Sequence, residues 1–215
     1  MATDLYNARM TADPADPLAA LRDATASRHA ELDEGMPLAR PLPTLDDYRD
    51  HLSLLRRWIG PIEAWQAGFS DGPQDAALLP PAPHLPLIEA DLADPSLAPA
   101  AAVPPPAPWQ GRDSAAYRWG VAYVIEGSRL GGTVLYRRLA DRLAQHPLRY
   151  LNGGGVPPGP RWQHFIRTLR AQVQGATAVA EACQGARDAF DGLIALRRAD
   201  AANAAGLAAR PRAAA

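Results

Sequence analysis

The chain has 215 residues, enough for one sizeable core, and its composition gives no reason to expect a second domain. Its formal net charge is -1, with acidic and basic residues interspersed, so nothing in the charge favours nucleic acid or an anionic membrane as a partner. Cys183 is the only cysteine, which excludes an internal disulfide and a cysteine-based zinc site.

No stretch approaches 18 uninterrupted apolar residues, and the first residues lack the basic and apolar pattern of a secretion signal. We therefore expect a soluble protein of a reducing cytoplasm. Residues 1–15 are polar and marked by proline, which predicts a flexible arm before a single domain over 16–200. An alanine-rich tail over 201–215 is predicted to be disordered.

Two helices are predicted in the first third of the domain. Asp16 suits a helix cap and Pro17 a first helical position, before an apolar face that includes Leu18 and Leu21. Thr44 and Asp47 have the spacing of a capping box, and an amphipathic pattern follows to about residue 67.

Two proline-rich connectors are expected over 70–86 and 94–111, with a short helix between them over 87–92. The remaining helices follow the second connector. Asp113 or Ser114 is predicted to cap a long helix that contains several glycines. Pro160 is expected to open the next helix, and a last one is expected over 177–199. Because no segment alternates in the manner of a strand, the predicted fold is all-α.

The glycines of the long helix form a stripe on one side. At about 100° per residue, Gly120, Gly127 and Gly131 fall within an arc of about 40°. Each costs about 1 kcal/mol against alanine inside a helix, so some packing or functional gain is expected to offset them. The spacing fits either the close crossing of another helix or a flat ligand against the backbone.

Two segments resemble a known family. Residues 21–29, LRDATASRH, resemble the first helix of haem oxygenases, and residues 120–135, GVAYVIEGSRLGGTVL, are similar to their distal helix. The form YVxEGSxLGG looks like the bacterial branch that is found alongside phytochromes, and the resemblance covers roughly 18–196. It implies an all-α fold in which haem lies between a proximal helix and a kinked distal helix.

The resemblance assigns roles to particular residues. His29 matches the proximal ligand of the haem iron. Without that context, it would be read as a partly buried histidine on an amphipathic face. Glu31 or Asp33 is expected to accept a hydrogen bond from its second ring nitrogen. Gly127 and Gly131 match the glycines that touch the porphyrin. Ser128 stands where the animal-type pattern has an aspartate that organises distal water.

Other side chains have less specific predictions. Arg22 and Arg170 match basic positions that bind the haem propionates, with Arg167 as an alternative. Tyr123 flanks the glycine stripe, where it either lines the pocket or packs against a helix. Glu126 is expected to pair with Arg129 or Arg118. Structural or surface roles are expected for His51, His84, His146 and His164, and helix packing for the five tryptophans and Cys183.

The resemblance implies a bacterial haem oxygenase that takes haem b as cofactor and substrate. With O2, it would open the ring to biliverdin, carbon monoxide and ferrous iron. Because the chain has no flavin or iron–sulfur motif, electrons are expected from a ferredoxin- or flavin-type reductase, with a bacteriophytochrome as one candidate acceptor of biliverdin. The alternatives are a haem-sequestering or sensor protein, and a thiaminase-like or metal-carboxylate enzyme, for which no Glu-x-x-His pair appears.

Overall fold

The computed structural model describes residues 16–82, 84–99 and 106–208, and in these residues the regular structure is helical, without strands. This confirms the predicted all-α fold. The α-helices are α1 (Pro17–Gly35), α2 (Leu45–Gln66), α3 (Leu85–Leu92), α4 (Ala115–Leu139), α5 (Pro158–Gln172) and α6 (Gly175–Ala208). Short 3-10 helices are η1 (Pro37–Ala39), η2 (Gly72–Gln74) and η3 (Gly153–Gly155). The predicted arm, 1–15, lies outside the described residues.

The helices begin where the capping residues predict. Asp16 accepts a hydrogen bond from the Leu18 amide at 3.3 Å, and Pro17 occupies the first position of α1. Thr44 and Asp47 form both bonds of the capping box of α2. Of the two candidates at α4, Ser114 is the cap, since its hydroxyl accepts from the Tyr117 amide at 3.2 Å. Each start is thus stabilised by a residue within one turn.

Three helices extend beyond the predicted bounds. α3 begins at Leu85, two residues before its expected start at residue 87, and α5 begins at Pro158, two residues before Pro160. α6 runs from Gly175 to Ala208, so residues 201–208, predicted to be disordered, are helical. The rest of the predicted tail, 209–215, lies outside the described residues. In the part of the chain that the structure describes, no helix has the length and apolar character needed to cross a membrane.

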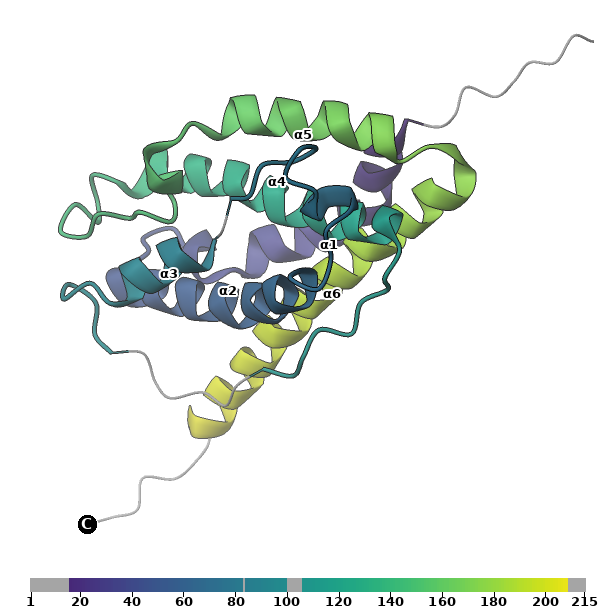
Figure 1. Cartoon of the computed structure of the whole chain (residues 1–215). Helices are drawn as coiled ribbons and strands as arrows, with labels where there is room; N and C mark the ends of the chain where they lie inside the picture. The colour runs from purple at the N-terminus through teal and green to yellow at the C-terminus, as the bar shows by residue number, and fades with distance from the viewer. Residues whose placement is uncertain (1–15, 83, 100–105, 209–215) are drawn as a thin grey trace, which may run out of the picture.

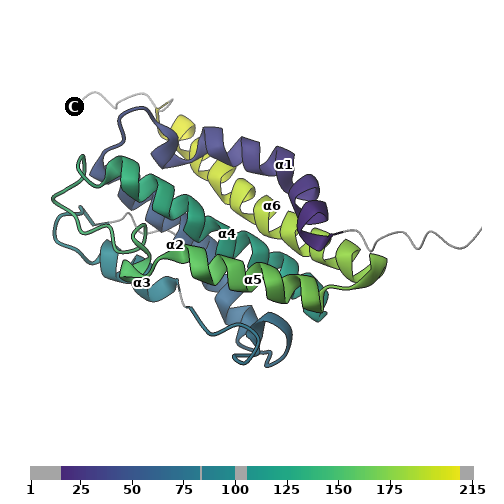
Figure 2. The ribbon, with the colours of Figure 1, turned by 90° about the horizontal axis from the view of Figure 1, so that it is seen from above.

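The helices pack around α4 and α6. Figure 1 shows α5 along one side of α4, with α2 and α3 on the other side. In Figure 2, α6 runs between α1 and α4, and these two helices make its most extensive contacts. Cys183 is buried on α6, and burial raises the pKa of its thiol, which fits the predicted packing role.

The crossing of α4 and α6 uses the first glycine of the stripe. A Cβ on Gly120 would lie 1.8 Å from the carbonyl oxygen of Ala182, and one on Gly185 would lie 2.1 Å from the carbonyl oxygen of Tyr117. Both distances are too short for any side chain, so each helix presents a glycine to the backbone of the other. For Gly120, the helix-crossing alternative is therefore correct.

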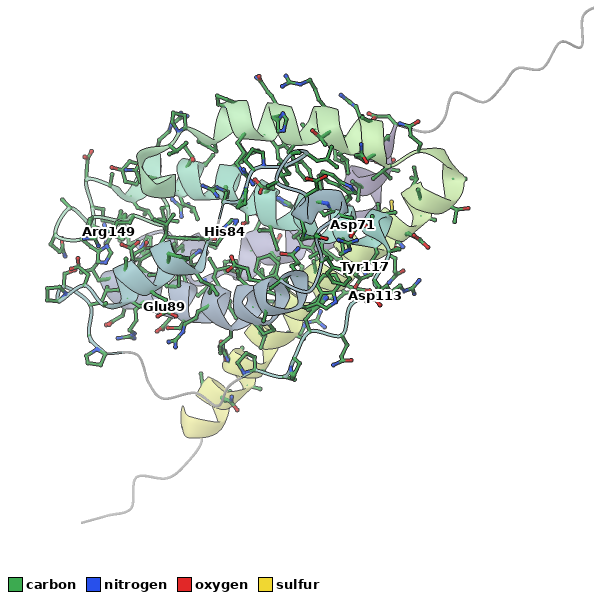
Figure 3. All side chains as sticks on the ribbon, viewed as in Figure 1. Asp71, His84, Glu89, Asp113, Tyr117 and Arg149 are labelled. Atoms are coloured by element: carbon green, nitrogen blue, oxygen red, sulfur yellow. The ribbon has the colours of Figure 1, made fainter. Side chains whose placement is uncertain are left out.

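Arg118 fastens the loop around η2 to the start of α4. Its guanidinium, in a side chain only 1% exposed, donates to the Asp71 carboxylate at 2.6 Å and to Gln74 at 2.6 Å. It also lies 4.1 Å from the centroid of the Phe69 ring. Figure 3 labels Asp71 and Tyr117 in the same region of the view, and Arg118, the neighbour of Tyr117 in sequence, bonds Asp71. Arg118 is thus not available to Glu126.

Candidate functional site

A cavity of about 380 Å³ lies between α1, α2, α4 and α6, and its volume falls within the range of small-molecule sites. Its walls are mostly apolar and aromatic, with Leu55, Trp58, Trp162 and Phe190 among them. The predicted site residues that line it are His29, Tyr123, Gly127, Ser128 and Gly131. The structure therefore brings five of the seven predicted site residues to one cavity, and leaves Arg22 and Arg170 outside its lining.

His29 enters the cavity from α1, and one of its ring nitrogens is already engaged. Nδ1 lies 2.9 Å from Oδ2 of Asp33, one helical turn later, and the histidine side chain is 65% exposed. Because an ionised carboxylate only accepts, Nδ1 carries the hydrogen in this contact, and in the neutral imidazole Nε2 then keeps its lone pair for a ligand. Of the two expected acceptors, Asp33 is the one used, whereas Glu31 binds Arg197 and Arg198.

The second and third glycines of the stripe face the cavity. A Cβ on Gly127 would have the Trp162 ring as its nearest neighbour, at 3.9 Å, and one on Gly131 would meet no described atom within 4 Å. These two positions form an open cradle that side chains would fill. α4 is helical throughout this stretch, and the kink implied by the resemblance stays a prediction.

Ser128 and Tyr123 flank the cradle. The Ser128 hydroxyl donates to the carbonyl oxygen of Ile125 at 2.7 Å, the bond to the preceding turn that is usual for serine in a helix. Tyr123 lines the cavity with its ring 5.9 Å from that of Trp162, which favours the first of its two predicted placements. Burial raises the pKa of the Tyr123 phenol, while Thr25 and Arg22 act in the opposite direction.

Two polar residues that the sequence did not assign to the site also line the cavity: His51, for which a structural or surface role was expected, and Tyr150. His51 is 6% exposed, and burial lowers its pKa to about 4. Tyr150 is 8% exposed, and burial raises its pKa to about 12. Within the described residues, neither Nδ1 of His51 nor the Tyr150 hydroxyl has a hydrogen-bond partner. Leaving such atoms buried without a bond is costly. Buried polar atoms of this kind are therefore typical of a surface that receives a polar ligand or water.

A sequence signal existed for one of them. His51 stands at helical spacing with Leu55 and Trp58, so a polar residue interrupts an apolar stripe of α2. Tyr150 lies between α4 and α5, outside any helix, where no periodicity indicates which way a side chain points.

The two arginines predicted to bind propionates are placed differently. Arg170 donates two hydrogen bonds of 2.8 Å to Asp16, and this contact lowers the pKa of that carboxyl to about 2. Arg22 is exposed on α1 and close enough to Tyr123 to act on its phenol. Arg167 is exposed on α5. Their roles toward a ligand remain predictions.

Glu126 has a different partner from those predicted. Both of its carboxylate oxygens accept from Arg161 on α5, at 2.6 and 2.7 Å, and the glutamate is 7% exposed. The expected pairing with Arg129 or Arg118 was wrong, because α5 brings a closer guanidinium to that side of α4. Glu126 therefore serves as a buried ion-pair residue on the side of α4 that faces away from the glycine cradle.

Comparison with known proteins gives one close match. The chain is 44% identical over 92 residues to a protein named heme oxygenase from Xanthomonas campestris pv. campestris (strain 8004), a segment that covers 42% of this chain and about half, 52%, of the relative. No family model matches the chain. No solved structure matches it either. The relative confirms the resemblance to the haem oxygenase family, while the phytochrome-associated branch stays a prediction.

Proposed function

We propose that this protein is a haem oxygenase that binds haem b in the cavity between α1 and α4 and opens its ring to biliverdin, carbon monoxide and ferrous iron. The observation that carries the proposal is the pairing of His29, fixed by Asp33, with the open cradle at Gly127 and Gly131 in one cavity. The likeness to a heme oxygenase from Xanthomonas campestris supports it.

The residues present suit haem. The cradle at Gly127 and Gly131 leaves space for a flat ring, and the apolar walls at Trp58 and Phe190 suit its hydrocarbon surface. His29 offers a neutral imidazole nitrogen, the donor that haem iron most often takes from a protein. When bound, haem would supply both the iron that activates O2 and the ring that is oxidised.

The chain's own groups would hold, orient and enclose the ligand. Asp33 holds the His29 tautomer, so that Nε2 is the nitrogen presented to iron. The cradle sets the distal face close to main chain, where a side chain would block it. Position 128 holds a serine, so no carboxylic acid stands there to donate a proton directly, and the serine hydroxyl itself donates to the Ile125 carbonyl.

The propionates would be bound at the rim. Arg22 is the first candidate because it lies near Tyr123, which lines the cavity. Arg170 would have to release Asp16 before it could bind a propionate, and the exposed Arg167 is the alternative on α5. Arginine binds carboxylates through two parallel hydrogen bonds, which suits it to this task.

Electrons would come from a ferredoxin- or flavin-type reductase, and a bacteriophytochrome is one candidate acceptor of the biliverdin. The second candidate function is a haem carrier or sensor without turnover. It is favoured by Ser128, whose hydroxyl is committed to the Ile125 carbonyl and which replaces the aspartate of the animal-type pattern. Both functions require the same cavity, and they differ in whether bound haem is consumed.

A haem titration followed by turnover under air with a reductase system tests the proposal. We expect a Soret band on binding, and then its loss with growth of a broad red biliverdin absorption. His29→Ala should weaken or alter ligation. The matched control is His164→Ala, since His164 bonds the Leu78 carbonyl outside the cavity and should behave as wild type.

Each outcome decides between the functions. A Soret band that forms and then persists under reductant and oxygen would identify a carrier or sensor. A chain that gives no Soret band with haem does not have the proposed function. If His29→Ala and His164→Ala had equal effects on the Soret band, His29 would not be the proximal ligand, and another residue would bind the haem iron.

A further inference from the structure

A second cavity, of about 370 Å³, lies on the opposite side of α4 from the first. Ala122, Ile125 and Glu126 of α4 line it, and on a helical wheel they point about 120° to 160° away from the midpoint of Gly127 and Gly131. His84, the residue immediately before α3, also lines this second cavity and is labelled in Figure 3. The two cavities are therefore separated by α4 and by the residues beside it.

The rings of Tyr150 and His84 adjoin each other between the two cavities. Tyr150 lines the first cavity and His84 the second, and their ring centroids are 6.3 Å apart. The two residues are 8% and 3% exposed. Among the described residues, neither the Tyr150 hydroxyl nor Nε2 of His84 has a hydrogen-bond partner. Two buried, unbonded polar atoms on adjoining rings are groups that one bridging water can satisfy.

The groups that act on the Tyr150 phenol come from both cavities. Burial is the main cause that raises its pKa, and the charge of Glu63 adds to it, whereas the nearby Ser128 hydroxyl and the charge of Arg129 lower it. Ser128 belongs to the first cavity and Glu63 to the second, where Glu63 also accepts from the His84 amide at 3.0 Å. The hydroxyl thus lies at the boundary between them.

Both groups keep the proton states that a hydrogen-bonded chain needs. Burial, with Arg129 and Arg161 nearby, lowers the pKa of His84 to about 3, so its ring is neutral near pH 7 and one nitrogen carries a hydrogen. The Tyr150 hydroxyl also keeps its hydrogen. Ser128 cannot act as the hydrogen-bond donor in place of Tyr150, because its own hydroxyl hydrogen is donated to the Ile125 carbonyl.

From these contacts, and resting on the proposed function, we infer that Tyr150 is the distal hydrogen-bond donor and that His84 supports it through a bridging water. Nε2–H of His84 donates to that water, the water donates to the Tyr150 oxygen, and the Tyr150 hydroxyl donates to water lying against Gly127 and Gly131. No proton is transferred in this arrangement. It satisfies both unbonded atoms and makes Tyr150 and His84 positioning residues for the distal face.

The pH at which the Soret band of the ferric haem complex shifts reports hydrogen bonding on the distal face. We expect Tyr150→Phe to move that midpoint by half a pH unit or more, and His84→Leu to move it in the same direction. His84→Gln, which keeps an N–H donor, should recover part of the shift. The matched control is Tyr117→Phe, because the Tyr117 hydroxyl bonds Asp188 away from the cavity and its loss should leave the midpoint unchanged.

The haem-free protein provides a second readout. NMR chemical shifts of the His84 ring nitrogens should change in Tyr150→Phe and not in Tyr117→Phe. If His84→Leu adds its full shift to that of Tyr150→Phe in the double variant, the two residues act separately and the bridge is refuted. If Tyr150→Phe and His84→Leu bind and degrade haem but keep the wild-type midpoint of the Soret shift, this inference alone is overturned. Absence of any Soret band in wild type would overturn the proposed function and this inference with it.

Discussion

A Cβ on Gly120 would lie 1.8 Å from the carbonyl oxygen of Ala182, whereas one on Gly131, three helical turns later on the same stripe of α4, would meet no described atom within 4 Å. The stripe therefore serves two purposes. Its first glycine lets α4 and α6 cross at backbone contact, and the later ones leave room for a ligand. The same residue type offsets its cost in helix stability by packing at one end and, under the proposed function, by ligand binding at the other.

Substituting the two glycines should separate these purposes. Gly120→Ala should lower the free energy of unfolding by about 3 kcal/mol or more, because the methyl group meets backbone that cannot rotate away. Gly131→Ala should leave it unchanged or raise it by up to about 1 kcal/mol, and should weaken haem binding instead. Urea unfolding of the haem-free variants measures both. Equal stability of the two variants would contradict the close crossing.

The carboxylate behind His29 should tune the proximal ligand. Asp33→Asn replaces a charged acceptor with a neutral amide oxygen, a weaker acceptor, and should lower the iron–histidine frequency in the Raman spectrum of the ferrous haem complex, because the imidazole becomes a weaker donor to iron. Since the pair is largely exposed, the loss in haem affinity should stay below about tenfold. Glu31→Gln is the control, as Glu31 pairs with Arg197 and Arg198 instead. An unchanged frequency in Asp33→Asn would show that the contact does not act on the ligand.

Stability should fall as the pH drops from about 6.5 toward 4. The pKa values of His51 and His84 are lowered to about 4 and about 3 in the folded protein, so between these values and about 6.5 the unfolded chain binds more protons. Each histidine contributes a slope of up to about 1.4 kcal/mol per pH unit, with stability lost on acidification. Thermal unfolding against pH should show a shallower curve for His51→Leu than for wild type.

The same experiment tests the burial of His51 near neutral pH. Its Nδ1 has no bond to any described residue, so His51→Leu should not reduce stability at pH 7. Curves for wild type and His51→Leu that run parallel from pH 7 to pH 4 would mean that this histidine is not held neutral in the folded state.

Arg22 and Arg170 should differ in their effect on haem affinity. Arg22→Ala should weaken binding by about two- to fivefold, the usual strength of an exposed ion pair, and the effect should shrink at high salt. Arg170→Ala should have less effect, because Arg170 is already paired with Asp16 at 2.8 Å. Haem titrations at two salt concentrations measure both. A larger loss in Arg170→Ala would mean that this side chain leaves Asp16 when haem binds.

Much of the local structure was predictable because its causes lie within one or two turns of chain. Asp16, Thr44 and Ser114 cap helices through bonds to residues two or three positions away. The contact of His29 with Asp33 is likewise a relation between neighbours on a helix, although the sequence left Glu31 as an equal candidate. The position of the bare stripe on α4 follows from helical periodicity alone.

What the tertiary structure decided are the contacts between segments distant in sequence. Glu126 takes Arg161, 35 residues away, because α5 packs beside α4, and no pattern within α4 indicates that choice. Tyr150 and His84 adjoin only because the segment between α4 and α5 lies against the start of α3. Capping and periodicity depend on bonds within a single helix and can be read from sequence, whereas these pairings depend on how whole helices pack, which the sequence of any one segment does not contain.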